Sequence, residues 1–496
     1  MTWLGLLACT SLVDAQPTDP DRAAREAFFD DFVDKTLRRT AFSPPKWEAL
    51  GTDYRGYVTS RGLRERFAAA STEAELWDAV HRLNASRRDR HLRVEGPRPP
   101  LQCIPVRFYP DLGDERAPTF FVANFDAEAE AKGVSRGDGL VAIDGVPVEE
   151  RVEQLWDEAA YSTARNLYVR GLGNGGDYPG LLSCVRSEVS WSTRLTLRDA
   201  ATGASKTVEL PRTPPVPVAW WHQPLLPTRE GWRSRYAALG FTPLVETPDA
   251  VLYVDASRRV AVLEWLQLSQ VEKTLEAVLD AAEKHDALGY GLVLDLTHGR
   301  GGSRSELVVA TVADAPFETT FGNVRVEDRA FVEAHLGQHA GKVRRWIRRA
   351  LQAGAPYTTN EPFKLRHFPA GSDGVMKPAK RRFTGPRAAL LFPWGGSNLD
   401  QLAAMLVDNP GVGVHTMGMS AGGYSNTWEW SEALEVPGLG PVTFMWTVGH
   451  TLRPNGEVLE GNPARAADWR PLTRDNAPTY LTDLLRAGIA HVSESP

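Results

Sequence analysis

The pattern of apolar and polar positions changes along this chain, and its first region has a helical period. Residues 21–86 are rich in Ala, Glu, Asp and Arg, with apolar residues at helical spacing, among them Phe28, Phe29, Phe32 and Val33. Thr72, followed by Glu73 and Glu75, predicts the start of a further helix that runs through Leu83. We therefore expect a helical N-terminal domain over residues 21–100, which ends in a proline-rich segment.

Residues 101–211 show a second pattern, in which short apolar runs alternate with glycine turns. Strands are predicted at 103–108, 119–122, 139–143 and 190–197. Within this region Gly137-Asp138 leads into an apolar strand, which is followed by a second turn at Asp144-Gly145. This double turn resembles a PDZ domain. The resemblance implies a module that captures an extended peptide by strand addition at a sheet edge.

Residues 218–496 follow a proline-rich linker and alternate between strand and helix patterns. Strands are predicted at 260–265, 291–296 and 387–392, and helices at 269–283 and after Ser397. A strand, a crossover helix and a second strand imply a parallel sheet. We therefore expect an α/β domain with a parallel-sheet core in this region.

The length and charge of the chain restrict the classes of protein to which it can belong. At 496 residues the chain exceeds the size of a single core, so two or three domains are expected. Its net charge of -6 gives no general attraction to nucleic acid, and we expect no nucleic-acid partner. One basic cluster, Arg344, Arg345, Arg348 and Arg349 around Trp346, has the spacing of a solvated helix face.

The N-terminal residues 1–20 have features of an export signal. Residues 1–15 are mostly small or apolar and include no basic residue. Leu6-Leu7-Ala8-Cys9 resembles the lipobox of bacterial lipoproteins, in which the cysteine is lipidated. This favours an exported protein of the cell envelope or periplasm, with a lipid anchor at Cys9. A signal peptide normally has a charged start and a longer apolar core, so cleavage and lipidation both stay open.

Two further cysteines, Cys103 and Cys184, lack a Cys-x-x-Cys partner, which disfavours a metal or redox centre. In an exported protein they could form a disulfide, and two buried free thiols fit the sequence equally well.

The segment Pro393-Trp394-Gly395-Gly396-Ser397 is typical of a turn that displays a nucleophile, because it lies between an apolar run and an amphipathic helix pattern. A serine at the turn from a buried strand into a helix holds its hydroxyl beside the unpaired amides of the helix start. The two glycines permit a sharp turn and a close approach of a substrate carbonyl. An ordinary helix N-cap is the alternative for this serine.

A second segment, residues 291–303, ends a predicted strand in a glycine-rich loop. It resembles the Asp-Leu-Arg-Gly-Asn-Gly-Gly-Gly segment of the S41 family of serine peptidases, which includes the C-terminal processing peptidases and tricorn. The resemblance implies that Gly301 or Gly302 contributes to an oxyanion hole, and the Asn398 amide is a further donor. Thr297 stands in place of the family's arginine, which leaves the local hydrogen bonding open.

The general base is expected to be a histidine. In the processing-peptidase branch the base is a lysine, but Tyr424 occupies that position here, so a Ser-Lys dyad is not available. The tricorn-like branch uses serine, histidine and glutamate, and the segments around His91 and Glu460 resemble those of the two partners. An imidazole takes the serine proton near neutral pH when a carboxylate orients it. The resemblance therefore implies Ser397 as nucleophile, His91 as base and Glu460 as orienting acid.

Other residues compete for these roles. His298 is the main rival base because it lies in the glycine-rich loop, and His415 precedes the segment equivalent to the lysine. Glu457 is the alternative acid. His335 and His339 have the spacing of a helical metal pair, but no zincin glutamate accompanies them, and we expect both at the surface.

These features predict an α/β fold with an S41-type (ClpP/crotonase-like) catalytic core around a parallel sheet, a helical N-terminal region and a PDZ-like β-rich domain. The resemblance implies a serine-type peptidase that hydrolyses peptide bonds of protein or peptide substrates without a metal or cofactor. The alternative is a non-catalytic S41-fold protein that binds a peptide or a small apolar ligand, because a fold does not fix a function.

Overall fold

The structure is a computed structural model that describes residues 20–41, 44–172, 180–215, 229–339, 341–362 and 373–494. The expected leader with Cys9, and Pro217 of the expected linker, lie outside the described residues. No helix among the residues described is both long and apolar enough to span a membrane.

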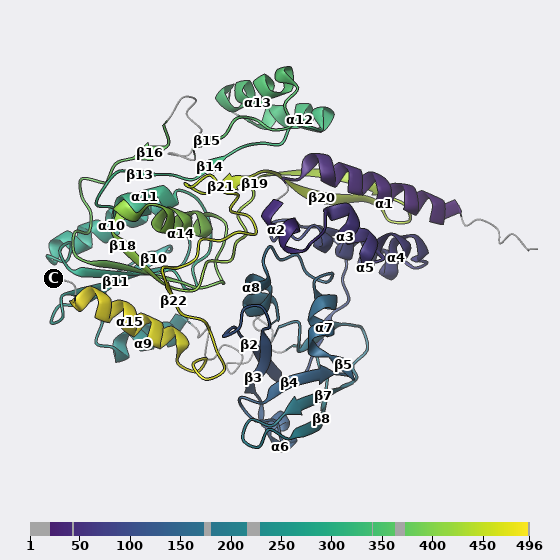
Figure 1. Ribbon diagram of the computed structural model, residues 1–496, viewed down its shortest axis with the longest axis horizontal. Coiled ribbons are helices and arrows are strands. Elements are labelled where there is room, and N and C mark those ends of the chain that lie inside the picture. Colours follow the sequence, from purple (N-terminus) through teal and green to yellow (C-terminus); the bar gives the residue numbers. More distant parts are fainter. Residues whose placement is uncertain are drawn as a thin grey trace, which may run out of the picture.

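A seven-stranded sheet forms the centre of the C-terminal region (Figure 1), in the order β22-β18-β17-β12-β11-β10-β9. Its strands are β9 Thr242–Glu246, β10 Ala250–Asp255, β11 Val260–Trp265, β12 Gly291–Asp295, β17 Arg387–Leu391, β18 Val414–Gly418 and β22 Asp468–Trp469. Strands β11, β12, β17, β18 and β22 run parallel, whereas β9 and β10 are antiparallel to their neighbours. The predicted parallel core is therefore confirmed, and its central strands β11, β12 and β17 are buried along their whole length because both faces are covered.

Helices cover both faces of this sheet and make three layers. Helices α10 Val271–Lys284, α11 Ser305–Ala310 and α14 Asn398–Asp408 share a core with one face, while α9 Arg229–Ala238 and α15 Tyr480–Glu494 cover the other. Along β12, Leu292 and Leu294 point to the first core and Val293 to the second. The turn of residues 392–397 joins the end of β17 to α14, which puts Ser397 at the carboxyl edge of the sheet.

The predicted helical region consists of α1 Pro20–Arg39, α2 Pro44–Ala49, α3 Tyr54–Ser60, α4 Leu63–Ala69 and α5 Glu73–Ser86. Thr72 caps α5 with a capping box completed by Glu75, as its sequence predicts. These helices share one core with helices α12 Arg329–His335 and α13 Gly341–Ala353 and with the hairpin of β19 Thr427–Val436 and β20 Gly440–Gly449. Phe32, for example, lies with its ring centroid 4.9 Å from that of Phe444. This packing brings the chain after α5 onto β20, where Val94 forms a bridge with Phe444.

A β-rich unit follows, at the bottom of Figure 1. It contains β1 Leu101–Cys103, β2 Val106–Asp111, β3 Thr119–Phe125, α6 Ala127–Ala131, β4 Gly139–Ile143, β5 Val146–Pro147, α7 Val148–Leu155, α8 Ala164–Asn166, β6 Cys184–Arg186, β7 Ser192–Arg198 and β8 Ser205–Pro211. The single strand predicted at 103–108 is wrong, because it is two strands in two sheets. Strand β1 pairs with β6 and β2 with β3, and the change of partner falls at Pro105, which has no N–H to continue a ladder.

The remaining short strands link the core regions. They are β13 Phe317–Glu318, β14 Phe321–Gly322, β15 Glu361–Pro362, β16 Val375–Met376 and β21 Thr451–Leu452, and β15, β14 and β21 form one small sheet in that order.

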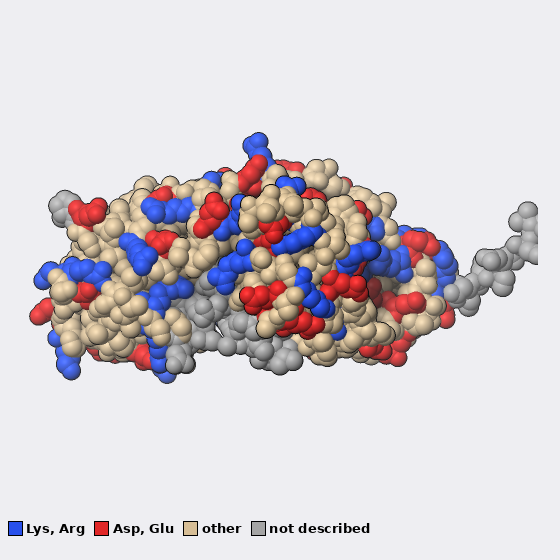
Figure 2. Space-filling model, turned by 90° about the horizontal axis from the view of Figure 1, so that it is seen from below, with Lys and Arg blue, Asp and Glu red and all other residues tan. Residues whose placement is uncertain are grey.

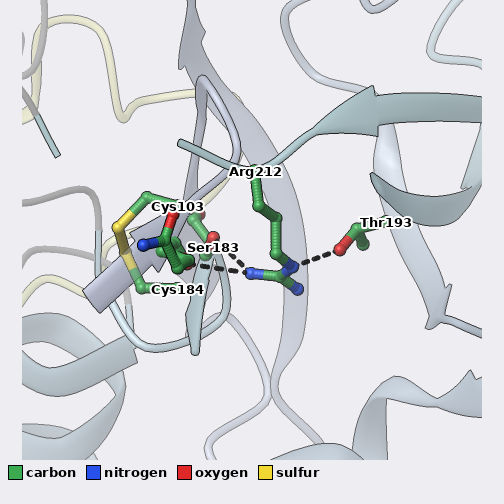
Figure 3. The surroundings of a disulfide bond; sticks show 6 residues. Cys103, Ser183, Cys184, Thr193 and Arg212 are labelled. Atoms are coloured by element: carbon green, nitrogen blue, oxygen red, sulfur yellow. Dashed lines mark hydrogen bonds between the residues drawn. A yellow bond between two sulfur atoms is a disulfide. The ribbon is translucent and has the colours of Figure 1, made fainter. Parts of the chain in front are cut away.

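Cys103 and Cys184 form a disulfide, which settles the alternative that the sequence left open. It joins β1 to β6, and Figure 3 shows the buried Arg212 beside it, donating to the Ser183 carbonyl at 3.0 Å and to the Thr193 hydroxyl.

Candidate active site

Ser397 occupies a strained turn between β17 and α14. Its φ of 59° and ψ of -127° lie in a region that non-glycine residues rarely adopt, at a cost of about 1–3 kcal/mol. Its N–H donates to the Tyr424 carbonyl at 2.6 Å, which fixes the turn. The residue is half-buried, so part of it faces solvent. The structure thus holds this serine at the start of a helix, where the sequence predicts a displayed hydroxyl.

Glycines surround this turn because there is no room for side chains. A Cβ added to Gly301 would lie 2.5 Å from the Ser397 Cβ and 3.1 Å from its Oγ. A Cβ added to Gly396 would lie 2.1 Å from the ring of Tyr424. The glycine-rich loop that follows β12 therefore lies directly against Ser397, as expected for a loop that would supply oxyanion donors.

The three predicted oxyanion residues occupy different positions around the serine. Asn398 is the first residue of α14, so its N–H has no acceptor within the helix. Its side chain is occupied, accepting from the Ser305 N–H and donating to Gln401. Gly302 has a φ of 153° and forms a bridge with Leu268, where a Cβ would lie 2.0 Å from the Leu268 carbonyl oxygen. Gly302 is thus needed for the loop's shape, whereas Gly301 is the glycine in contact with Ser397.

His91 lies in the loop after α5, with 12% of its side chain exposed. Its ring centroid is 5.4 Å from that of Tyr424, the residue whose carbonyl holds Ser397. Its Nδ1 is buried and makes no hydrogen bond to any described residue, and it lies 3.6 Å from Asp89 Oδ1. Burial lowers the pKa of His91, but the Asp89 carboxylate and, after it, Glu460 and Glu429 outweigh burial and raise the pKa above its ordinary value.

Asp89 is the carboxylate bonded to the His91 backbone, and the sequence pattern does not single it out. Its Oδ1 accepts from the His91 N–H at 2.9 Å, and its Oδ2 accepts from Asn426 at 3.0 Å and Thr447 at 2.6 Å. Burial raises the pKa of Asp89, but the facing His91 ring, the Lys46 charge and the Thr447 hydroxyl hold it well below its ordinary value. The signal in the sequence was its position two residues before His91.

Glu460 is fully buried beside the same histidine, but its oxygens are engaged by other groups. Oε1 accepts from Lys46 Nζ at 2.8 Å, and Oε2 accepts from the N–H groups of Ser425 at 2.8 Å and Asn426 at 3.3 Å. Burial raises the pKa of Glu460, with the Lys46 ammonium acting against it. Glu457, the alternative acid, is exposed and bonds to Asn455 and Asn462 instead.

Asp89, His91 and Glu460 each place one donor atom within 4.8 Å of the other two, a grouping that could hold a metal ion. Lys46 already neutralises Glu460, and the second oxygen of Glu460 is bonded to two backbone amides. The bonding favours a network of side chains over a set of metal ligands.

Tyr424 connects the parts of the site. Its hydroxyl accepts from Arg170 at 2.5 Å. Its N–H and that of Gly423 donate to the two oxygens of Asp400, each at 2.9 Å, and burial raises the pKa of Asp400 to about 8. Asp400 was also missed from the sequence, and it anchors the segment that contacts both Ser397 and His91.

The competing histidines lie in other networks. His298 Nε2 is 2.8 Å from Glu264 Oε1, and its Nδ1 is 3.2 Å from the Thr297 hydroxyl, which donates to Asp295. Thr297 therefore bonds within its own loop. His415 stacks on His491 with ring centroids 4.3 Å apart.

The expected surface position is wrong for His335. His335 is buried, stacks on Trp430 with centroids 5.0 Å apart, and bonds to the carbonyls of Phe331 and Ser431. His339 is half-buried and also contacts Trp430. The prediction failed because β19 covers this side of α12 and of the turn after it, a contact between distant segments that the local pattern does not report.

Contacts through Tyr424 and Ser425 thus connect the predicted residues Ser397, His91 and Glu460. Ser397 and His91 both contact Tyr424, and the Ser425 hydroxyl donates to the Ser397 carbonyl at 3.2 Å while its N–H donates to Glu460. A hydroxyl, a buried imidazole with a raised pKa and nearby carboxylates are the groups that acyl transfer requires.

Comparison with known proteins identifies the fold only through solved structures. No protein-family model and no curated protein matches the sequence. Mature CPAF complexed with lactacystin matches with a TM-score of 0.63 and 15% identity, over 95% of this chain and 98% of that chain. The photosystem II D1 C-terminal processing protease gives a TM-score of 0.37 at 13% identity, over 95% of this chain and 96% of that chain. Tricorn protease gives 0.39 at 11% identity, over 95% of this chain and 37% of that chain. The chain therefore has the fold of mature CPAF over nearly its whole length, while the other two TM-scores are below the level that defines a shared fold.

Proposed function

We propose that this protein is a serine-type, S41-like peptidase that hydrolyses peptide bonds of protein or peptide substrates. The observation that carries the proposal is the strained Ser397 turn, with Gly301 against its side chain and Tyr424 linking it to His91. The fold shared with mature CPAF over nearly the whole chain supports the same proposal.

In the proposed reaction Ser397 Oγ attacks the substrate carbonyl carbon while His91 takes the hydroxyl proton. The N–H groups of Asn398 and of Gly301 or Gly302 stabilise the oxyanion that forms. His91 then gives the proton to the leaving amine, and a water molecule releases the acyl group by the same route in reverse. Glu460 is the orienting acid that the family resemblance implies, and the contacts of Asp89 make it a second candidate for that role.

The location of the protein and the role of its β-rich unit also belong to this proposal. We infer export to the cell envelope or periplasm, with lipidation at Cys9, and the Cys103–Cys184 disulfide supports an oxidising compartment. The β-rich unit is proposed to act as a PDZ-like module that binds an extended peptide.

Labelling with a fluorophosphonate probe tests the proposal, because the probe reacts with an activated serine. We expect labelling of the native protein, no labelling of Ser397→Ala, and loss of labelling in His91→Ala. Lactacystin, which is bound in the CPAF structure, serves as a competitor. A folded protein that neither labels nor cleaves an unfolded protein substrate would be the non-catalytic binding protein of this fold.

A further inference from the structure

Helix α13 carries five cationic side chains, and none of them has an ion-pair partner among the described residues: Lys342, Arg344, Arg345, Arg348 and Arg349. Elsewhere arginines are commonly paired, as Arg39 is with Asp328 and Arg453 with Asp408. On the face shown in Figure 2, basic and acidic side chains lie intermingled. The cations of α13 thus form a local positive surface on a chain whose net charge is -6.

Three of these cations line a hollow with a volume of about 420 Å³, Lys342, Arg345 and Arg349. Its other walls include Trp346, whose Nε1 donates to the Thr359 hydroxyl at 2.9 Å, and Tyr357, whose hydroxyl accepts from Arg325 at 2.9 Å. Hydrogen bonds therefore hold both aromatic walls in place. Glu361 is the one carboxylate in a lining with three cations.

The burial of α13 argues against a lipid surface. An interfacial helix inserts an apolar face into the bilayer. The apolar residues of α13 are already buried in the core shared with α1 and the β19–β20 hairpin: Val343, Trp346, Ile347, Ala350 and Leu351. The large hydrophobic side chains that are exposed in the described chain, Leu50, Val141, Val189 and Trp191, lie outside α13.

The same burial argues against single-stranded nucleic acid, because binding of bases relies on exposed aromatic rings. Trp346 is 8% exposed and Tyr357 stacks on His450 with centroids 5.1 Å apart. An acidic polypeptide needs only the cations and a hollow beside them. Lys342 and Arg349 are about 10 Å apart along the helix. Side chains on one face of an extended chain repeat about every 7 Å, so neighbouring acidic residues of one segment span a distance of the same order.

We propose that this surface of α13 binds an acidic, extended segment of a polypeptide, and that the segment belongs to the substrate of the proposed peptidase. The second part rests on the proposed function. The hollow borders β15. Strands β15, β14 and β21 form one small sheet in that order. The Leu459 N–H donates to Thr451 of β21, and Glu460 follows. With about 5 Å between neighbouring strands, this sheet places the surface within reach of the same extended substrate.

Binding is measured by fluorescence anisotropy of a fluorescein-labelled peptide of alternating Glu and Ser, with the Ser397→Ala protein so that cleavage does not interfere. Lys342→Glu, Arg345→Glu and Arg349→Glu are combined in one variant. The matched control combines Arg136→Glu, Lys273→Glu and Lys377→Glu, which change the net charge equally at exposed positions away from the hollow. We expect the α13 variant to bind about tenfold more weakly and the control to bind nearly as the parent does.

Equal weakening in both variants would overturn the proposal, because it would show only an effect of net charge. Binding of a phosphatidylserine vesicle or a single-stranded oligonucleotide through the same cations, without peptide binding, would also overturn it. The substrate role is read separately, from cleavage of an unfolded protein with and without an added Glu-Ser segment. Peptide binding without any cleavage would refute the proposed peptidase and leave the acidic-peptide site standing.

Discussion

Asp89 Oδ1 accepts a hydrogen bond from the His91 backbone N–H at 2.9 Å and lies 3.6 Å from the Nδ1 of the same residue. One carboxylate therefore fixes the backbone of the histidine and faces its ring. Asn426 and Thr447, from the other end of the chain, hold the second oxygen of Asp89. The position of His91 thus depends on the docking of the N-terminal helices onto the C-terminal hairpin.

We predict that Asp89→Asn lowers the catalytic rate by about 100-fold and moves the acid limb of the pH profile to lower pH by about one unit. The base must be neutral, so activity rises as pH increases through the pKa of His91. Asp89 raises that pKa, whereas burial lowers it. Removal of the Asp89 charge therefore lowers the pKa of His91. The measurement is the pH dependence of kcat for a chromogenic peptide or ester.

Glu429→Gln is the control for this experiment. Glu429 also raises the pKa of His91 but is exposed, so its effect is screened by solvent. We expect a smaller shift and a nearly unchanged rate. An acid limb that stays in place in Asp89→Asn would show that Asp89 holds only the backbone.

The buried ion pair of Lys46 and Glu460 allows the structural role of Glu460 to be separated from an orienting role. Their atoms are 2.8 Å apart, with exposed fractions of 7% and 0%. Removal of one partner leaves a buried charge, so Lys46→Met and Glu460→Gln should each lower the free energy of unfolding by about 3 kcal/mol or more. The double variant should lose less than the sum of the two. Urea unfolding measures all three.

Activity in the same variants decides between the two acids. If Glu460 orients His91, activity is lost in Glu460→Gln and stays lost in the double variant, whatever the stability. If Glu460 only neutralises Lys46, the double variant recovers activity that Glu460→Gln has lost. Recovery would leave Asp89 as the orienting carboxylate.

The sequence predicted three strands of the central sheet, β11, β12 and β17, because they are apolar runs buried on both faces. It predicted none of β9, β10, β18 and β22. Strand β11 and the start of β12 coincide with the predicted bounds, and the turn at Ser397 was found from its glycines. The bonding of His91 and the burial of His335 were not predictable in the same way. Both depend on contacts between segments more than 90 residues apart, such as Asp89 with Thr447 and His335 with Ser431. A local pattern records which residues prefer to be buried, but not which partner covers them.

We predict that Gly301→Ala abolishes labelling by the fluorophosphonate while the protein stays folded. The added Cβ would lie 2.5 Å from the Ser397 Cβ and 2.7 Å from the Gly396 carbonyl oxygen, so the loop or the serine must move. A shift of about 1 Å at a reacting centre costs about 100-fold in rate. Gly289→Ala, which meets nothing within 4 Å, is the matched control and should label normally. Normal labelling of Gly301→Ala would place the oxyanion site elsewhere.

The disulfide should stabilise the β-rich unit. Cys103 and Cys184 are separated by 81 positions, and a disulfide typically gives about 2–4 kcal/mol of stabilisation. We expect a reductant to lower the urea midpoint of the native protein to that of the Cys103→Ser, Cys184→Ser double variant, and to leave the double variant unchanged. An unchanged midpoint in the native protein would mean that the thiols are not paired in solution.

Replacements of Ser397 itself should report the strain in its turn. Alanine keeps a Cβ at a φ of 59° and a ψ of -127°, whereas glycine adopts such angles without steric cost. Glycine relieves strain of about 1–3 kcal/mol. Its greater freedom in the unfolded chain lowers stability by only about 0.4–1 kcal/mol. Ser397→Gly should therefore be more stable than Ser397→Ala by about 1 kcal/mol in urea unfolding, although neither variant can be labelled. If Ser397→Ala is the more stable of the two, the turn is relaxed in solution, and the serine is not held in the conformation on which the proposed chemistry depends.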